Sequence, residues 1–212
     1  MSTSNVQLNS SVAVYLSKFD DTTTVGKVQP SIRNEAIECC TDELTKRQRY
    51  CVWQLLDYAL KRHFGMGVGD YDFTVDSNGK WHCDGACFSL THCNDVVAVA
   101  VSSKPVGVDV EAVANFERKV SDSKFLARVL TADEQGRIEA IDACERARAL
   151  AELWTRKESL FKLTGGASFV AKNISTSSLA YCQLVQMDGV EYALAVATND
   201  SLAVQVEIVN IW

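Results

Sequence analysis

Proline, glycine and long hydrophobic segments are all scarce in this 212-residue chain. Two prolines and eleven glycines argue against a fibrous repeat or a disordered chain. The longest uninterrupted apolar run, Val96–Val101, is far shorter than the roughly 20 residues needed to cross a bilayer. The N-terminal stretch MSTSNVQLNSS has no hydrophobic segment after a basic start. We therefore expect no targeting segment, no membrane association and a cytoplasmic location.

The chain also lacks an excess of basic residues. The net charge is −6, and residues 1–105 carry 10 basic and 12 acidic groups while residues 106–212 carry 11 and 15. Neither half has the excess of Lys and Arg that nonspecific nucleic-acid binding requires, so we expect no nucleic-acid partner. Hydrophobic residues make up 47% of the chain, which is enough for one large domain or two small ones.

Cysteine, in contrast, is abundant. Several of the eight cysteines lie in apolar surroundings, where a free thiol packs as a small hydrophobic group, and the chain is not a short secreted scaffold. We expect them to be reduced. The stretch His82–Cys93 suggests zinc, but its cysteine spacings do not match the tight pairs of zinc knuckles, so zinc is the less favoured interpretation.

Hydrophobic periodicity predicts an α+β protein. Thr41–Phe64 and Cys144–Leu163 repeat apolar residues at helical spacing, and glycines follow both segments. Shorter helices are expected at Arg118–Leu130 and after Thr131, whose spacing to Glu134 fits a capping box. Residues 20–34 read as a polar loop. Strands are expected at Val12–Phe19, Tyr71–Val75, Ala86–Leu90, Val96–Ser102, Val106–Glu111, Ser178–Gln186, Glu191–Ala197 and Leu202–Val209.

Both halves of the chain show the same order of elements: a strand, a long helix and about three strands. This order predicts a pseudo-dimer of two similar units, residues 1–105 and 106–212, each with a long helix packed on a small, mostly antiparallel sheet.

Two carboxylates lie close together in the segment VGVDVE. Asp109 and Glu111 are two positions apart, so on a strand both side chains point to one face. Neighbouring carboxylates repel each other unless a cation lies between them, and Mg²⁺ or Mn²⁺ suits oxygen ligands. The alternative is a strand end that exposes two acids to water, which is common at protein surfaces.

A third acid lies in the segment WTRKESLFK. Glu158 and Lys162 are one helical turn apart, a spacing also typical of a surface ion pair that stabilises a helix by about 0.3–0.5 kcal/mol. Trp154 lies one turn before Glu158 and places it near the core boundary, while Lys157 adds a second cation. Three acids with two lysines suit a metal–pyrophosphate group, in which the acids hold the ion and the lysines neutralise phosphate oxygens.

These two segments resemble the signature of the 4′-phosphopantetheinyl transferases, most closely the larger, single-chain, surfactin-type members. The family patterns (V/I)-G-(V/I)-D-(V/I)-E and W-x-x-K-E-(S/A)-x-x-K are met at every fixed position. Two further family features are altered: F-N-x-S-H reads FSLTH at 88–92, and G-K-P reads GKW at 79–81. Arg49 is the best match to an arginine that is usual in the first long helix.

The resemblance implies transfer of the phosphopantetheine arm of coenzyme A to a serine of an apo acyl or peptidyl carrier protein, with release of 3′,5′-ADP. It further implies Mg²⁺, with Mn²⁺ as a substitute, a cleft between two halves, and a monomer. The metal ligands would be Asp109, Glu111 and Glu158.

The resemblance also assigns roles to the other site residues. Glu158, Lys162 and Glu134 are the catalytic candidates; Glu134 is also the reciprocal glutamate of the capping box, and a metal-bound water is an alternative base. Residues expected to contact the pyrophosphate, the 3′-phosphate or nearby parts of the nucleotide are Arg49, Gly79, Lys80, Thr91, His92, Lys157 and Lys162.

Two other functions remain compatible with the residues. A Mg²⁺-dependent nuclease uses acids and a lysine in a related way, although the net charge of −6 argues against it. A protein of the same fold that holds coenzyme A or a carrier domain without transfer is the second alternative, although such a protein would not need a complete set of acids and lysines.

Overall fold

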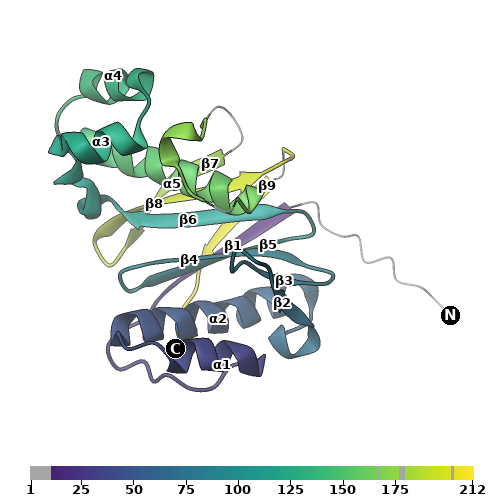
Figure 1. The fold of residues 1–212 in the computed structure, drawn as a ribbon. Helices are drawn as coiled ribbons and strands as arrows, with labels where there is room; N and C mark the ends of the chain where they lie inside the picture. Colours follow the sequence, from purple (N-terminus) through teal and green to yellow (C-terminus); the bar gives the residue numbers. More distant parts are fainter. Residues whose placement is uncertain (1–10, 167, 177–179, 202) are drawn as a thin grey trace.

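The computed structural model describes residues 11–166, 168–176, 180–201 and 203–212, which form a mixed α+β fold (Figure 1). The elements before residue 105 are β1 (Ser11–Lys18), α1 (Ser31–Glu38), α2 (Glu43–Phe64), η1 (Val68–Asp70), β2 (Phe73–Val75), β3 (Trp81–Cys83), β4 (Cys87–Cys93) and β5 (Val96–Ser102). Those that follow are β6 (Val106–Ala112), η2 (Val113–Phe116), η3 (Lys119–Ser121), α3 (Ser123–Val129), α4 (Ala132–Ala140), α5 (Arg146–Thr164), η4 (Ala171–Asn173), β7 (Ala180–Met187), β8 (Val190–Thr198) and β9 (Ala203–Ile208).

The ends of the helices follow from local chemistry. The side chain of Asp42 accepts a hydrogen bond from the backbone N–H of Thr45 at 3.0 Å and starts α2. The predicted capping box is present at the start of α4. Both long helices end at a glycine in the left-handed region, Gly65 with φ 77° and Gly165 with φ 68°. The sequence therefore predicts the two long helices closely.

Two sheets lie face to face between the two long helices (Figure 1). The first has the strand order β4-β5-β1-β9, and the second has the order β6-β8-β7. Helix α2 packs on the first sheet, and α5 packs on the outer face of the second. A separate two-stranded ribbon, β2-β3, lies beside them.

Strand β5 explains why the longest apolar run is uninterrupted. Val97, Val99 and Val101 belong to the core beneath α2, whereas Val96 belongs to the core between the two sheets. All seven residues of β5 are buried. A strand covered on both faces needs apolar side chains at every position rather than at alternate ones.

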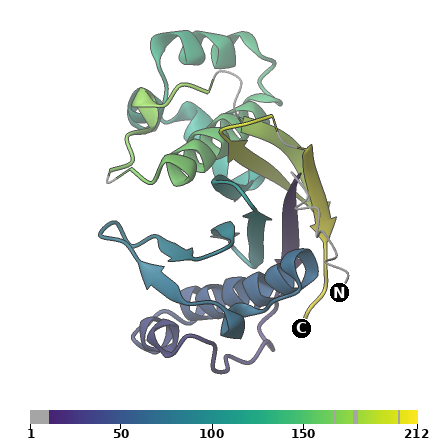
Figure 2. The same cartoon turned by 90° about the vertical axis from the view of Figure 1, so that its right-hand side faces the viewer.

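The last strand crosses the predicted boundary at residue 105. β9 pairs in parallel with β1, with Ser11 opposite Ala203 and Leu16 opposite Ile208, so it belongs to the sheet of the N-terminal half (Figures 1 and 2). The chain is therefore not divided into two sheets strictly by sequence, because the segment after residue 202 returns to the first sheet.

Several local predictions differ from the structure. Helix α1 occupies the end of the expected loop 20–34 and continues to Glu38; Ile37 is its one buried residue, so it has no apolar period to detect. The helix expected at Arg118–Leu130 is interrupted, because Asp122 accepts hydrogen bonds from the backbone of the next residues and starts α3 at Ser123. β3 is too short to show alternation.

Some expected strand residues lie outside the described part of the chain. They are the first two residues of the predicted strand Ser178–Gln186 and the first residue of Leu202–Val209.

Within the described ranges, none of the helices is long and apolar enough to pass through a membrane.

Helix α5 lies unusually close to β6 at Gly107. A Cβ atom at this position would lie 2.0 Å from the carbonyl oxygen of Ser159 and 2.6 Å from the backbone nitrogen of Leu163. Both are backbone atoms, so a side chain at residue 107 would push the helix away from the strand. The glycine of the VGVDVE segment is therefore required by packing.

We predict that Gly107→Ala lowers the free energy of unfolding by about 3 kcal/mol, because a methyl group overpacks the contact between α5 and β6. Gly136→Ala is the matched control: residue 136 is inside α4, and a methyl group added there would meet no atom within 4 Å. The control should raise stability by about 0.5–1 kcal/mol. Urea unfolding measures both, and equal stability of the two variants would contradict the packing role of Gly107.

Candidate active site

The two sheets meet along β4 and β6, and side chains rather than backbone pairs connect these strands. The hydroxyl of Ser89 accepts a hydrogen bond from the backbone N–H of Val108 at 3.0 Å. Two positions further along β4, the hydroxyl of Thr91 donates to Oδ1 of Asp109 at 2.9 Å. This contact orients the first acid of the predicted pair.

Asp109 is buried and only partly satisfied. Its Oδ1 atom accepts hydrogen bonds from Thr91 and from Nζ of Lys162, which lies 2.8 Å away. Its Oδ2 atom is also buried but has no hydrogen-bond partner among the described residues. A buried charged oxygen without a partner is costly, so Oδ2 marks a position where a ligand would be favourable.

The other two predicted acids share the surroundings of Asp109. Burial raises the pKa of Glu158 to about 7, and the negative charges of Asp109 and Glu111 contribute, while Lys162 opposes the rise. Burial and the charge of Asp109 also raise the pKa of Glu111. The structure thus brings together the three acids predicted from two distant sequence segments, and their mutual repulsion favours a cation among them.

The acids fit a partial site for a divalent metal ion. Over the described ranges, no three His, Cys, Asp or Glu side chains converge as a ready-made metal site. Mg²⁺ rarely uses a cage made only of protein ligands; it is usually held by one or two carboxylates, with substrate phosphates and water completing the shell. Oδ2 of Asp109 has no partner within the described part of the chain, and this atom and the raised pKa values of its neighbours agree with such an arrangement.

The lining beside the acids is cationic. The side chain of Arg33 stacks over the rings of Trp53 and Trp81, with its Cζ atom 5.0 Å and 5.8 Å from their centroids. Burial and then the charge of Arg49 lower the pKa of Arg33 to about 10. The buried Nε atom of Arg33 has no hydrogen-bond partner among the described residues. An arginine in this environment is favourable for an anion.

His92 lies among these cations. Its surface remains accessible, but the protein atoms packed around the ring remove much of its hydration and lower its pKa to about 4; the charges of Lys162, Arg49 and Arg33 add to the effect. His92 is therefore neutral at pH 7 in the free protein.

The sequence analysis did not select Arg33 as a site residue, because it lies in the segment 20–34 that was expected to be a loop. Pro30, which directly precedes the first residue of α1, was the sequence signal for a helix here.

Lys80 connects the β2-β3 ribbon to the other half of the protein. Its Nζ atom donates to the backbone oxygen of Lys162 at 2.5 Å, and the side-chain amide of Asn78 donates to the backbone oxygen of Gly165 at 3.1 Å. Both contacts satisfy carbonyl groups at the C-terminal end of α5. Gly79, with φ 81°, forms the turn between them.

A cavity of about 280 Å³ lies at this junction. It is lined by Asn78, Gly79, Lys80, Trp81, Phe88, Ser89, Leu90, Phe161, Lys162, Gly165 and Gly166. Predicted residues from both halves therefore share one cavity, next to the acids.

Two sequence-based assignments disagree with the structure. Thr91 was expected to contact the nucleotide, but it is buried and its single hydroxyl proton is directed to Asp109. Lys157 was expected to contact the pyrophosphate, but it is fully buried, and its ammonium group donates to Oε2 of Glu134 at 2.8 Å and to the backbone oxygens of Val129 and Ala171, both at 3.0 Å. Three bonds use all three protons of the ammonium group.

The Lys157–Glu134 pair also changes the interpretation of Glu134. Oε2 of Glu134 accepts from Lys157 and from the backbone N–H of Thr131, at 2.8 Å in each case. These bonds stabilise the carboxylate and tie α4 to α5. We therefore assign Glu134 and Lys157 to the framework that holds α5 in place, and Glu158 remains as the catalytic carboxylate candidate.

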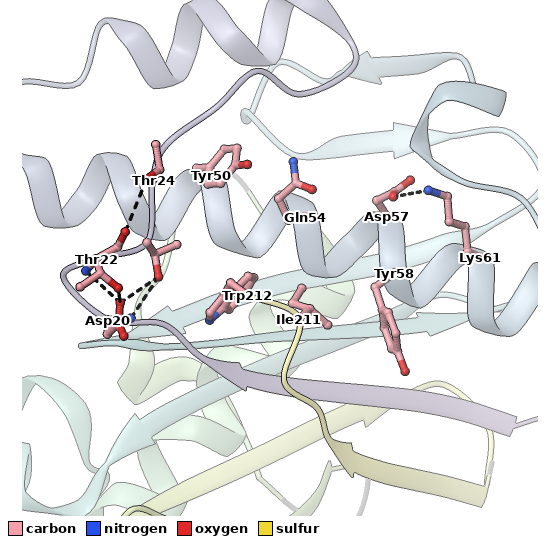
Figure 3. Close-up of a pocket in the computed structure, with 11 residues that line it drawn as sticks. Asp20, Thr22, Thr24, Tyr50, Gln54, Asp57, Tyr58, Lys61, Ile211 and Trp212 are labelled. Atoms are coloured by element: carbon pink, nitrogen blue, oxygen red, sulfur yellow. Dashed lines mark hydrogen bonds and ion pairs between the residues drawn. The ribbon is translucent and has the colours of Figure 1, made fainter.

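A larger cavity of about 540 Å³ lies away from the acids, between α2 and the C-terminal segment (Figure 3). It is lined by Asp20, Thr22, Thr23, Thr24, Tyr50, Gln54, Asp57, Tyr58, Lys61, Ile211 and Trp212. In Figure 3, Asp57 pairs with Lys61, and Asp20 is bonded within its own turn. The charged side chains of this cavity therefore already have partners. Oδ2 of Asp109, in contrast, has none among the described residues.

We predict that Glu158→Gln makes the metal-free protein more stable at neutral pH. The folded-state pKa of about 7 lies above the ordinary value of 4.5, so between these values the native state holds a proton that the unfolded state has released. The wild type therefore loses stability as pH rises from about 4.5 to about 7. The advantage of Glu158→Gln should grow over this window and stay constant above it. Urea unfolding with EDTA measures this difference, and a pH-independent difference would show that Glu158 has an ordinary pKa.

Comparison with known proteins shows which proteins this chain resembles. Residues 105–199 match the sequence profile of the 4′-phosphopantetheinyl transferase superfamily. The chain is 27% identical over 138 residues to the 4′-phosphopantetheinyl transferase psf-1 of Bacillus pumilus, covering 64% of this chain and 54% of that protein. It is 28% identical over 104 residues to AcpT of Escherichia coli K12, covering 46% and 51%.

A third relative is the 4′-phosphopantetheinyl transferase gsp of Aneurinibacillus migulanus, with 27% identity over 86 residues, 41% of this chain and 34% of that protein. The chain thus spans about half the length of the first two curated relatives, 54% and 51%. The matched segment contains the acids of β6 and the Glu158–Lys162 motif of α5. Through residues 105–199, this chain is similar to the 4′-phosphopantetheinyl transferase superfamily.

Proposed function

We propose that this protein transfers the 4′-phosphopantetheine arm of coenzyme A to a serine of an apo acyl or peptidyl carrier protein. The serine oxygen bonds to the phosphorus that carries the arm, the bond from that phosphorus to the bridging oxygen of the pyrophosphate breaks, and 3′,5′-ADP leaves. The observation that carries the proposal is the half-satisfied carboxylate of Asp109, which faces Lys162 and lies beside two further acids.

In this proposal Asp109, Glu111 and Glu158 would hold Mg²⁺, or Mn²⁺ in its place. The ion would supply charge neutralisation for the pyrophosphate oxygens during departure of 3′,5′-ADP. Lys162 contributes a second positive charge at the same place, because its Nζ atom is already held at Oδ1 of Asp109. Its position between an acid and the cavity suits it to a phosphate oxygen.

Glu158 is suited to receive the proton of the serine hydroxyl. A general base works best when its pKa lies near the operating pH, and burial together with neighbouring acids places the pKa of Glu158 near 7. The same carboxylate is a candidate metal ligand, so a water held between Glu158 and the ion is the alternative base. Glu134 is less suited, because Lys157 occupies its carboxylate.

The cations of the N-terminal half would receive the 3′-phosphate of coenzyme A and nearby groups of the nucleotide. Arg33, Arg49 and His92 are close enough to influence one another electrostatically. Lys80 and Gly79 would border the nucleotide from the ribbon. Burial is the main cause of the lowered pKa of His92, and binding of a dianion here would relieve the repulsion from neighbouring cations that adds to it.

We also propose the finer architecture expected from the sequence. Residues 1–105 would contribute the nucleotide side and residues 106–212 the metal side of one active site in a monomeric pseudo-dimer. The packing of α2 and α5 on separate sheets supports this division, with β9 as the segment that links the two.

The alternative functions are less well supported. A nuclease needs an open basic surface for a phosphate backbone, whereas the cations here lie in a partly buried group beside tryptophan rings. A binding protein without transfer activity would not benefit from three carboxylates that repel one another.

The decisive experiment is mass spectrometry of an apo carrier protein incubated with the protein, coenzyme A and Mg²⁺. We expect the carrier to gain the mass of the phosphopantetheine arm. Glu158→Gln should slow the transfer by about 10²–10⁴-fold, because it removes a charge and a proton acceptor next to the reacting oxygen. Glu152→Gln, on the same helix and outside the acid group, is the control and should transfer normally. Transfer by Glu158→Gln within a few-fold of wild type would refute its role.

The 3′-phosphate assignment predicts discrimination between two substrates. Arg33→Met should raise the KM for coenzyme A by about tenfold, the loss of one charge-assisted contact, and should change the KM for dephospho-coenzyme A much less. Arg47→Met is the control, because Arg47 pairs with Asp21 at 3.1 Å instead of facing the cations. Equal losses with both substrates would show that Arg33 does not contact that phosphate.

A further inference from the structure

The face of β4 that meets β6 carries three small polar side chains in a row. Ser89 contacts the backbone of β6, Thr91 contacts Asp109, and Cys93 contacts Glu111. These three residues lie at every second position, so they share one face of the strand. Two of the three hydrogen bonds end on the acids of the proposed metal site. The third member, a cysteine, has no role in the function proposed above.

Cys93 is buried and is surrounded by hydrogen-bonding groups. Its Sγ atom lies 3.4 Å from Oε2 of Glu111, 3.3 Å from the backbone nitrogen of Ala112 and 3.4 Å from Nδ2 of Asn115. Both nitrogen atoms are donors, so the sulfur accepts from each of them. The one proton of the thiol is then left to donate to the Glu111 carboxylate.

We propose that Cys93 is a positioning residue, whose thiol fixes the carboxylate of Glu111 in the orientation that receives the divalent cation. This inference rests on the proposed function, because it gives Glu111 the role of a ligand. Thr91 performs the same task for Asp109, so β4 orients both acids of β6. Groups that hydrogen-bond to metal ligands typically change metal affinity by about 10–100-fold when removed.

The distances explain why sulfur suits this position. Hydrogen bonds between two oxygen atoms are normally about 2.5–3.0 Å long, whereas the gap between Cys93 and Glu111 is 3.4 Å. A serine hydroxyl has a shorter reach than a thiol, so it would fill this gap less well, although it can still donate. An alanine would leave Glu111 without this donor. The expected order of metal affinity is therefore wild type, Cys93→Ser, Cys93→Ala.

The chain offers a matched control. Cys51 is also a fully buried thiol, but it lies in α2 within the core formed with the first sheet. Cys51→Ala removes the same atoms from a core position without removing a donor to an acid. It should lower stability through the cavity it leaves and should leave metal affinity unchanged.

The test measures Mn²⁺ binding from the electron paramagnetic resonance signal of the free ion, in the presence of coenzyme A. We expect Cys93→Ala to weaken Mn²⁺ binding by about tenfold. Cys93→Ser should recover part of the loss, and Cys51→Ala should bind as wild type does. At saturating metal, the KM for coenzyme A should be the same in all four proteins, because the nucleotide contacts lie on other residues.

The outcomes separate this inference from the proposed function. Wild-type affinity in Cys93→Ala would refute the positioning role while leaving the transferase proposal intact. The predicted order of affinities without arm transfer by the wild type would support the positioning role and refute the transferase. A wild type that binds no Mn²⁺ in the presence of coenzyme A would refute both.

Discussion

The close contact between α5 and β6 determines the geometry of the site. Gly107 has no side chain, so the backbone of the helix can lie directly on the strand. This contact places Lys162 against Asp109, and it brings Glu158 under the influence of the acids of β6. The buried pair of Lys157 and Glu134 holds α5 from its other side. Stability and the arrangement of charges therefore depend on the same helix position.

Charge is separated within the site. The acids lie on β6 and α5, which belong to the C-terminal half, whereas Arg33, Arg49 and His92 come from the N-terminal half. Burial first, and then repulsion between like charges, raise the pKa of Glu158 and lower those of Arg33 and His92. A ligand that carries phosphates at one end and is bridged by a cation at the other would relieve both kinds of repulsion. Proteins commonly place such strain at functional sites.

The sequence predicted what depends on period and spacing. Long amphipathic helices, capping residues and paired acids are local patterns, so α2, α5 and the pair of Asp109 and Glu111 could be read from the sequence. Adding Glu158 to this pair required the second motif, in a distant segment, and the ligand roles of the three acids stay a prediction. Roles that depend on tertiary contacts were not. Nothing local shows that Lys157 is buried among carbonyl groups or that Arg33 lies over two tryptophan rings. Likewise, the sequence does not show that Thr91 and Cys93 contact Asp109 and Glu111, because these contacts depend on the packing of β4 against β6.

The parallel pairing of β1 with β9 has a consequence for synthesis of the chain. Strand β1 gains its partner on one side only when β9, residues 203–208, has been synthesised. Until then β1 presents an open edge, and such edges favour pairing with other chains. Folding of the N-terminal sheet during translation is therefore incomplete until the C-terminal segment emerges, and a chain shortened before residue 203 would keep an exposed edge prone to aggregation.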